Sequence, residues 1–119
     1  MNITVKLNID NAKIKSRISA AKKIAMFATS KQALDDCNYY CKEDQDGLIN
    51  SSLTFSDFEN GKLRWNTVYA RMQYYLDSAN TDINPNARKM WAHHAESVHG
   101  KDWQAVFEAA LRKYLKEQK

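Results

Sequence analysis

Residues 60–68, NGKLRWNTV, combine a turn signal with a strand signal and decide the expected fold. Asn60 and Gly61 both tolerate a positive φ, which a type I′ hairpin turn requires. Apolar residues and Thr alternate with polar residues after the turn, which predicts a strand over 62–68 with one buried face. We expect the other hairpin strand in the Ser-, Thr-, Leu- and Phe-rich residues 48–58.

Toward the N-terminus, residues 2–9 (NITVKLNI) alternate cleanly between polar and apolar side chains, which predicts another strand. Asp10 or Asn11 is a suitable N-cap for a following helix. Apolar residues then recur at spacings near 3.6, so we predict an amphipathic helix over about 11–40.

Toward the C-terminus, residues 69–83 read mainly as a loop, with at most a short helical turn at their start. Asn84-Pro85 is a typical helix start. Gly100 interrupts the apolar stripe that follows, which predicts either one long helix kinked there or two helices. The expected class is α+β, with a long helix near each end and a small antiparallel sheet.

The chain has 119 residues, of which 27% are charged and 44% hydrophobic, as in an ordinary soluble domain. We expect a single domain over residues 1–119. No apolar run approaches the length of about 20 residues that a membrane helix needs, and the N-terminus lacks the apolar core of a secretory signal. Cys37 and Cys41 do not form a disulfide framework, which fits a reducing compartment.

The net charge of +4 hides a strong polarity along the chain. Residues 11–31 carry basic side chains without an acid: Lys13, Lys15, Arg17, Lys22, Lys23 and Lys31. Residues 35–46 are mostly acidic, with Asp44 and Asp46 beside Gly47. Such polarity suits contact with nucleic acid or head-to-tail contact between identical subunits.

No group of residues has the pattern of a catalytic or metal site. Cys37 and Cys41 would share a helical face, but His93, His94 and His99 do not supply the second pair at zinc-site spacing, so we interpret them as core cysteines. We expect no cofactor and no metal.

The sequence lacks the patterns of three common classes of enzyme site. Asp44, Asp46, Asp57 and Glu59, with Lys62, are the residues that could suggest a metal-dependent nuclease. All four acids lie around turns, where acidic residues are common in any protein, so they do not indicate a nuclease site. Neither a Gly-x-Ser-x-Gly elbow nor a glycine-rich phosphate loop occurs. We therefore expect a protein without enzymatic activity.

The aromatic residues separate into two groups. Trp65, Trp91 and Trp103 lie on apolar stripes, and we predict that they are buried. The loop-like segment after residue 68 carries Tyr69, Arg71, Tyr74 and Tyr75. Because Tyr and Arg are enriched at protein interfaces, these residues, together with Asp44, Asp46 and Gly47, are candidates for an interaction surface. Packing of the tyrosines in the core is the alternative.

Several segments occur in the order of a known family: DQDGLINSS at 44–52, GKLRWNTVYARMQYY at 61–75, and NPNA at 84–87 with Trp91. In this the chain resembles the small minor capsid proteins of siphophages and prophages, and more broadly head–tail connector and tail-completion proteins. The resemblance spans almost the whole chain. It departs from the family pattern where Gln45 and Asp46 precede Gly47, where Val68 precedes Tyr69, and where Leu76 follows the paired tyrosines.

The resemblance implies a structural virion protein that forms a ring, a hexamer or dodecamer, at the head–tail junction after assembly in the host cytoplasm. The implied partners are copies of itself, neighbouring portal or head-completion proteins and tail proteins, with non-specific contact to DNA in the lumen and none to a membrane. A small basic nucleic-acid-binding protein that uses the 13–31 helix is the alternative function, and a nuclease or hydrolase is a more distant one.

Overall fold

The computed structural model of the chain describes residues 2–9, 19–42, 47–77 and 84–117. Helices and a two-stranded sheet confirm the α+β class. The elements follow one another as β1 (Ile3–Lys6), α1 (Ser19–Tyr39), α2 (Leu48–Phe55), the 3-10 turn η2 (Phe58–Asn60), β2 (Lys62–Trp65), α3 (Ala70–Tyr75) and α4 (Trp91–Glu117).

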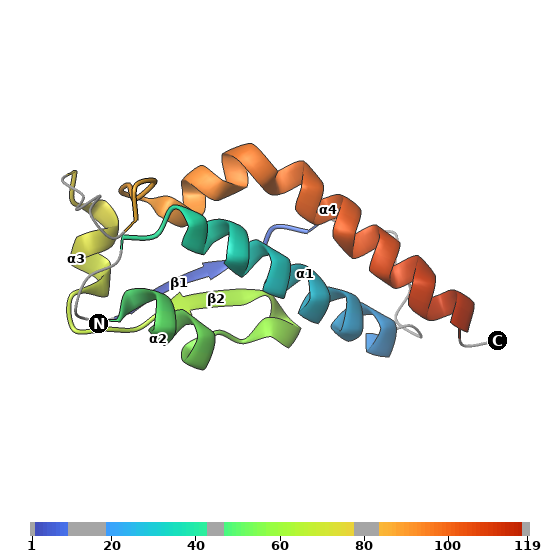
Figure 1. Ribbon diagram of the computed structural model, residues 1–119. Coiled ribbons are helices and arrows are strands. Elements are labelled where there is room, and N and C mark those ends of the chain that lie inside the picture. Colours follow the sequence, from blue (N-terminus) through green and yellow to red (C-terminus); the bar gives the residue numbers. More distant parts are fainter. Residues whose placement is uncertain (1, 10–18, 43–46, 78–83, 118–119) are drawn as a thin grey trace.

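The molecule is elongated, with extents of 50 × 24 × 21 Å. Helices α1 and α4 run in opposite directions along its length, and α3 lies at the end remote from the C-terminus (Figure 1). The main core lies between these two helices and the sheet. A smaller core between α1 and α4 contains Ala21, Ala25, Phe107 and Leu111.

The sheet pairs β1 with β2 in antiparallel orientation, with Ile3 opposite Trp65 and Lys6 opposite Lys62. The predicted strands at 2–9 and 62–68 are therefore present, although both are shorter than expected. The predicted strand at 48–58 was wrong, because the partner of β2 comes from the N-terminus and residues 48–55 form α2.

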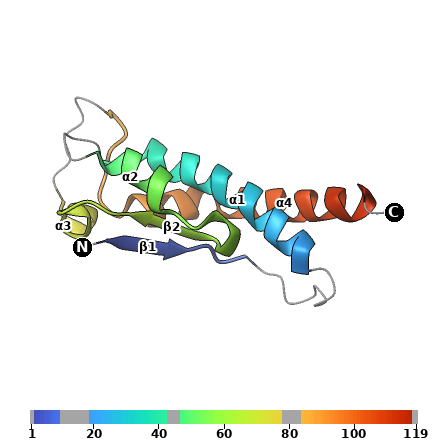
Figure 2. The same ribbon diagram turned by 90° about the horizontal axis from the view of Figure 1, so that it is seen from below.

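Helix α2 occupies the place of that missing strand, beside the outer edge of β2 (Figure 2). Its buried side includes Leu48, Ser51 and Ser52, whose spacing of three and four residues is helical. The Ser51 and Ser52 hydroxyls donate to carbonyls one turn earlier, at 2.7 and 2.6 Å. The small serines allow helix and strand to approach closely, and this packing overrides the strand propensity of the segment.

The turn at Asn60-Gly61 exists but has a different form from the prediction. Gly61 adopts φ 69°, whereas Asn60 is in the 3-10 turn η2 and has no positive φ, so this is not a type I′ hairpin. A Cβ on Gly61 would lie 2.9 Å from the Met26 sulfur, so a larger residue would make this flexible side chain shift, and the positive φ is what favours glycine here. The turn leads into β2 through a single bridge between Asp57 and Lys62.

Helix α1 matches the described part of the helix predicted over 11–40, and its end is capped from a distant segment. The Asn84 side-chain amide donates to the carbonyl oxygens of Tyr39 and Cys41, at 3.0 and 2.8 Å. Carbonyls near a helix end lack partners within the helix, so Asn84 satisfies them. Asn84 thus caps the end of α1 and does not start a long helix.

Helix α4 begins at Trp91, later than the predicted start at Asn84-Pro85, and runs without interruption through Gly100. Met90 has φ 50°, which separates the turn at 84–87 from the helix. Its N–H donates to the Tyr74 carbonyl at 2.6 Å, while its carbonyl accepts from His94 at 2.9 Å. A tertiary contact therefore fixes where α4 begins.

All three tryptophans are buried, as predicted, with exposed fractions of 3% or less. Trp65 donates from Nε1 to Asn38 Oδ1 at 2.9 Å, and Trp103 donates to Asp36 Oδ2 at 2.7 Å. Trp91 packs edge-on against Trp65 and Tyr74, with ring centroids 5.8 and 4.7 Å away. This aromatic cluster joins α4, β2 and α3.

Candidate functional site

Residues 70–75, predicted mainly as loop, form the helix α3, which is held from its inner side by Tyr74. The Tyr74 side chain is fully buried, and its hydroxyl contacts His93 Nδ1 and accepts from the His93 backbone N–H at 3.1 Å. Burial raises the pKa of the Tyr74 phenol. Tyr74 is thus a core residue, and its prediction as a surface contact was wrong.

Polar contacts fix the C-terminal end of α3. Lys42 is 4% exposed, and its Nζ donates to the Leu76 carbonyl at 2.5 Å. Burial lowers the pKa of the Lys42 ammonium. Lys89 pairs with Asp77 at 2.5 Å, and its hydrogen bond lowers the pKa of the Asp77 carboxyl. These contacts tie the helix to the ends of α1 and α4.

The outer side of the same segment is apolar and exposed, and we term it the α3 surface. Exposed fractions range from 45 to 71%. Met72 is three residues from Tyr75 and four from Leu76, so it shares a face with both. The α3 surface consists of Val68, Tyr69, Met72, Tyr75 and Leu76. Arg71 is also exposed on this helix.

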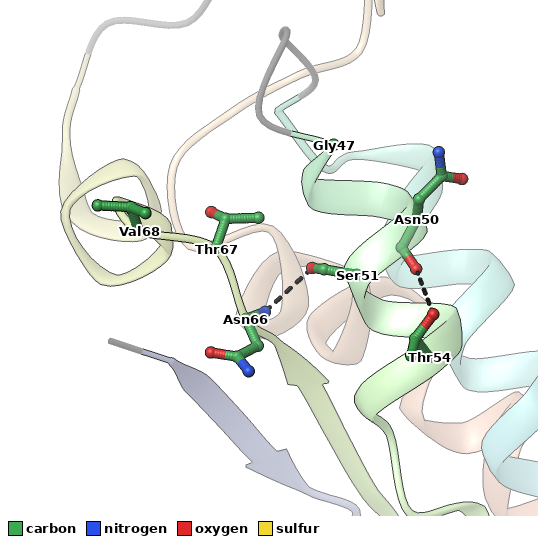
Figure 3. A pocket seen from close by; sticks show the side chains of 7 residues that line it. All are labelled: Gly47, Asn50, Ser51, Thr54, Asn66, Thr67 and Val68. Carbon is green, nitrogen blue, oxygen red and sulfur yellow. Dashed lines mark hydrogen bonds between the residues drawn. The ribbon is translucent and has the colours of Figure 1, made fainter.

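A polar depression lies beside the α3 surface and contains Gly47, another predicted interaction residue (Figure 3). Gly47 has φ 71° and precedes α2, so the predicted turn is present but begins a helix instead of a strand. Val68 lines the far side of the depression. The fold therefore brings the described part of the predicted segment 44–52 beside residues 66–68, which directly precede Tyr69. Asp44 and Asp46 lie outside the described residues.

The predicted basic helix is only partly described, because Lys13, Lys15 and Arg17 lie outside the described residues. Lys22 is half-buried, whereas Lys23 and Lys31 are exposed. The Lys31 ammonium lies over the Phe58 and Phe27 rings, 4.8 and 5.7 Å from their centroids. Lys31 therefore already makes cation–π contacts within its own chain.

The cysteines are buried, and His94 and His99 contact neighbouring side chains of the same chain. Cys37 and Cys41 are buried, and burial raises the pKa of the Cys37 thiol, which disfavours the reactive thiolate. Cys41 follows the end of α1, so the two do not share one helix. His94 packs on Tyr40, with centroids 4.5 Å apart, and burial lowers its pKa. His99 contacts Asp102 at 3.3 Å.

No metal-binding group of three His, Cys, Asp or Glu residues occurs in the described part of the chain. Of the acids considered above, Asp57 accepts from Asn60 Nδ2 at 2.7 Å in the exposed turn before β2. Among the described helices, none is long and apolar enough to span a bilayer. The most distinctive feature of this fold is therefore an apolar surface on a firmly anchored helix.

Comparison with known protein families shows the class of protein in which this surface occurs. The family described as "Minor capsid protein" matches residues 5–111 of the chain. The chain belongs to this family. As a phage minor capsid protein it is a structural component of the virion. No match was found among curated proteins or among solved structures.

Sequence reasoning missed three members of the α3 surface, namely Val68, Met72 and Leu76. These three residues are spaced four apart, which is a helical period and was the available signal for one exposed face. Ala70 and Tyr74 are also four apart and occupy the buried face. The helical period was obscured because both faces of this short segment are apolar.

Proposed function

We propose that this minor capsid protein is a ring-forming head–tail connector (neck) or tail-completion protein that joins the portal complex of the capsid to the tail. The supporting observation is the α3 surface. A helix locked from one side by Tyr74 and Lys42 presents its exposed apolar residues in a fixed geometry, which lowers the entropic cost of docking. Its role is assembly without catalysis.

A ring requires two different surfaces that contact each other between neighbouring copies. A second exposed apolar patch lies on α1, where Ile24 and Phe27 are 47 and 43% exposed and line a depression with Lys23 and Glu59. In Figure 1 the N-terminal half of α1 lies well away from α3 along the molecule. We propose that the α3 surface of one copy docks on this α1 patch of the next.

In this proposal the ring is a hexamer or dodecamer at the head–tail junction, between portal or head-completion proteins and tail proteins. DNA in the lumen contacts basic side chains without base readout, because contacts between cations and phosphates carry no sequence information.

The test compares particles assembled with wild-type or variant chain. The double change Met72→Ser plus Tyr75→Ser removes apolar area from the α3 surface only. We expect unchanged circular dichroism but a strong depletion of the variant from purified particles, measured by mass spectrometry. Leu53→Ser is the matched control, because Leu53 on α2 is 53% exposed, against 51% for Met72.

Normal incorporation of the double variant would show that the α3 surface is not the contact. Electron cryomicroscopy of intact particles tests the location, and density for this chain on the capsid shell instead of the neck would contradict a connector. Tight duplex binding that weakens steeply with salt, and is lost on changing Lys22 and Lys23 to Gln, would favour the nucleic-acid-binding alternative.

A further inference from the structure

The two outer edges of the small sheet differ in their hydrogen bonding. At the β2 edge, Lys62 N–H donates to the Asp57 carbonyl at 2.9 Å, Arg64 N–H to Ser56 Oγ at 2.9 Å, and Asn66 N–H to Ser51 Oγ at 3.0 Å. Helix α2 and the residues that follow it therefore close this edge. Figure 2 shows β1 on the other side of β2, along the outside of the molecule.

The β1 edge is open. Leu7 N–H donates to the Gly61 carbonyl at 2.6 Å, which fixes the alternation of the antiparallel ladder. Backbone groups of Ile3, Val5 and Leu7 therefore point toward β2, and those of Thr4 and Lys6 point away from it. Within the described residues, no hydrogen bond engages the outward backbone groups of Thr4 or Lys6. Such groups are a template for another strand.

The solvent face of the sheet is cationic. Lys6 lies directly opposite Lys62, and Arg64 is on the same face, where its Nε donates to Thr4 Oγ1 at 2.8 Å. Like charges opposite each other across a pair of strands are destabilising. Among the described residues these three cations have no ion-pair partner, and the nearby Asp57 carboxylate accepts from Asn60. An acidic ligand would relieve this repulsion.

A depression beside α4 lies just beyond the C-terminal end of β1. Asn8, which follows β1, lines it together with Glu96, Val98 and Lys101. Val98 is 53% exposed. A strand added to β1 would place alternate side chains toward the cationic face and toward the opposite face of the sheet, and a strand that continued past Lys6 would reach this depression.

We propose that the open edge of β1 binds an extended segment of another virion protein in which acidic and apolar residues alternate. The segment pairs antiparallel with β1, its acidic side chains lie beside Lys6 and its apolar side chains lie on the opposite face of the sheet, on the side of Ile3 and Val5. A second copy of β1 is disfavoured, because it would bring further lysines to a face that already carries unpaired lysines. This site is separate from the α3 surface and does not depend on ring formation.

The probe is a fluorescent eight-residue peptide that alternates Glu and Val, titrated against the full chain by fluorescence polarisation. We expect saturable binding, and binding at least about fivefold weaker for the Lys–Val peptide of equal length. Residues opposite Lys6 share its face and direct their amides to β1. N-methylation of the Glu amides should therefore abolish binding, whereas N-methylation of the Val amides should be tolerated.

Protein variants test the same contact from the other side. Lys6→Glu should weaken binding of the Glu–Val peptide by about fivefold or more. Lys113→Glu is the control, because it changes net charge equally on an exposed part of α4. Hydrogen exchange should slow at Thr4 and Lys6 when peptide binds, while Val5 and Leu7 are protected throughout. Equal binding of both peptides, tolerance of Glu N-methylation, or competition by duplex DNA at lower concentration than the peptide would overturn the proposal.

Discussion

Tyr74 and Tyr75 are neighbours on α3 with opposite environments. Their rings touch edge to face, with centroids 5.1 Å apart. Tyr74 is fully buried between Trp91 and His93, whereas Tyr75 is 56% exposed. The comparison teaches that one six-residue helix separates residues that hold the fold from residues free to contact a partner. Residue type does not reveal which is which, because both are tyrosine.

Replacing Tyr74 should have the largest effect on folding. Tyr74→Ala removes a fully buried aromatic side chain and should lower the free energy of unfolding by about 3–5 kcal/mol, a large part of the roughly 5–15 kcal/mol typical of a domain. Tyr75→Ala should change it by only about 1 kcal/mol or less, because an exposed ring that contacts Tyr74 edge to face is removed. Urea denaturation of both variants measures the difference. Similar losses for the two would mean that the faces of α3 are not distinct.

Lys42 supports the inner face at the end of α3. Lys42→Met keeps an apolar stem but removes the ammonium that donates to the Leu76 carbonyl, so we expect a loss of about 1 kcal/mol and faster amide exchange in α3. Lys62→Met, at an exposed position on β2, is the control. Unchanged exchange in α3 would show that this contact does not hold the helix.

The exposed pair of Asp77 and Lys89 should have the smallest effect. Lys89 holds the pKa of Asp77 below its ordinary value of 3.8, so the stabilisation is fully present above about pH 4. It is lost as the pH falls through the folded-state pKa. Thermal unfolding should therefore distinguish wild type from Asp77→Asn slightly at pH 7 and progressively less below pH 4. A difference that persists in strong acid would contradict this role of the ion pair.

The sequence predicted those features that depend on local periodicity. The strand at the N-terminus, the helix ending near Tyr39, the helix of the C-terminal region and the buried tryptophans all follow from alternation or a 3.6-residue period. The candidate interaction residues were predicted less well. Tyr69 and Tyr75 are exposed and stay candidates for partner contact. The prediction for Tyr74 was wrong, because its position on α3 directs its side chain toward Trp91.

By itself, then, the sequence determined the α+β class, the core tryptophans and the family. Only the tertiary structure decided the partner of β2, the helical state of 48–55 and the start of α4 at Trp91. The physical reason is that each depends on groups far apart in the chain. In place of a third strand, the Ser56 hydroxyl accepts from the Arg64 amide in β2, and the Ser51 hydroxyl accepts from the amide of Asn66 just after it. Likewise, the Tyr74 carbonyl accepts from Met90 just before α4 begins. Such long-range hydrogen bonds leave no period in the local sequence.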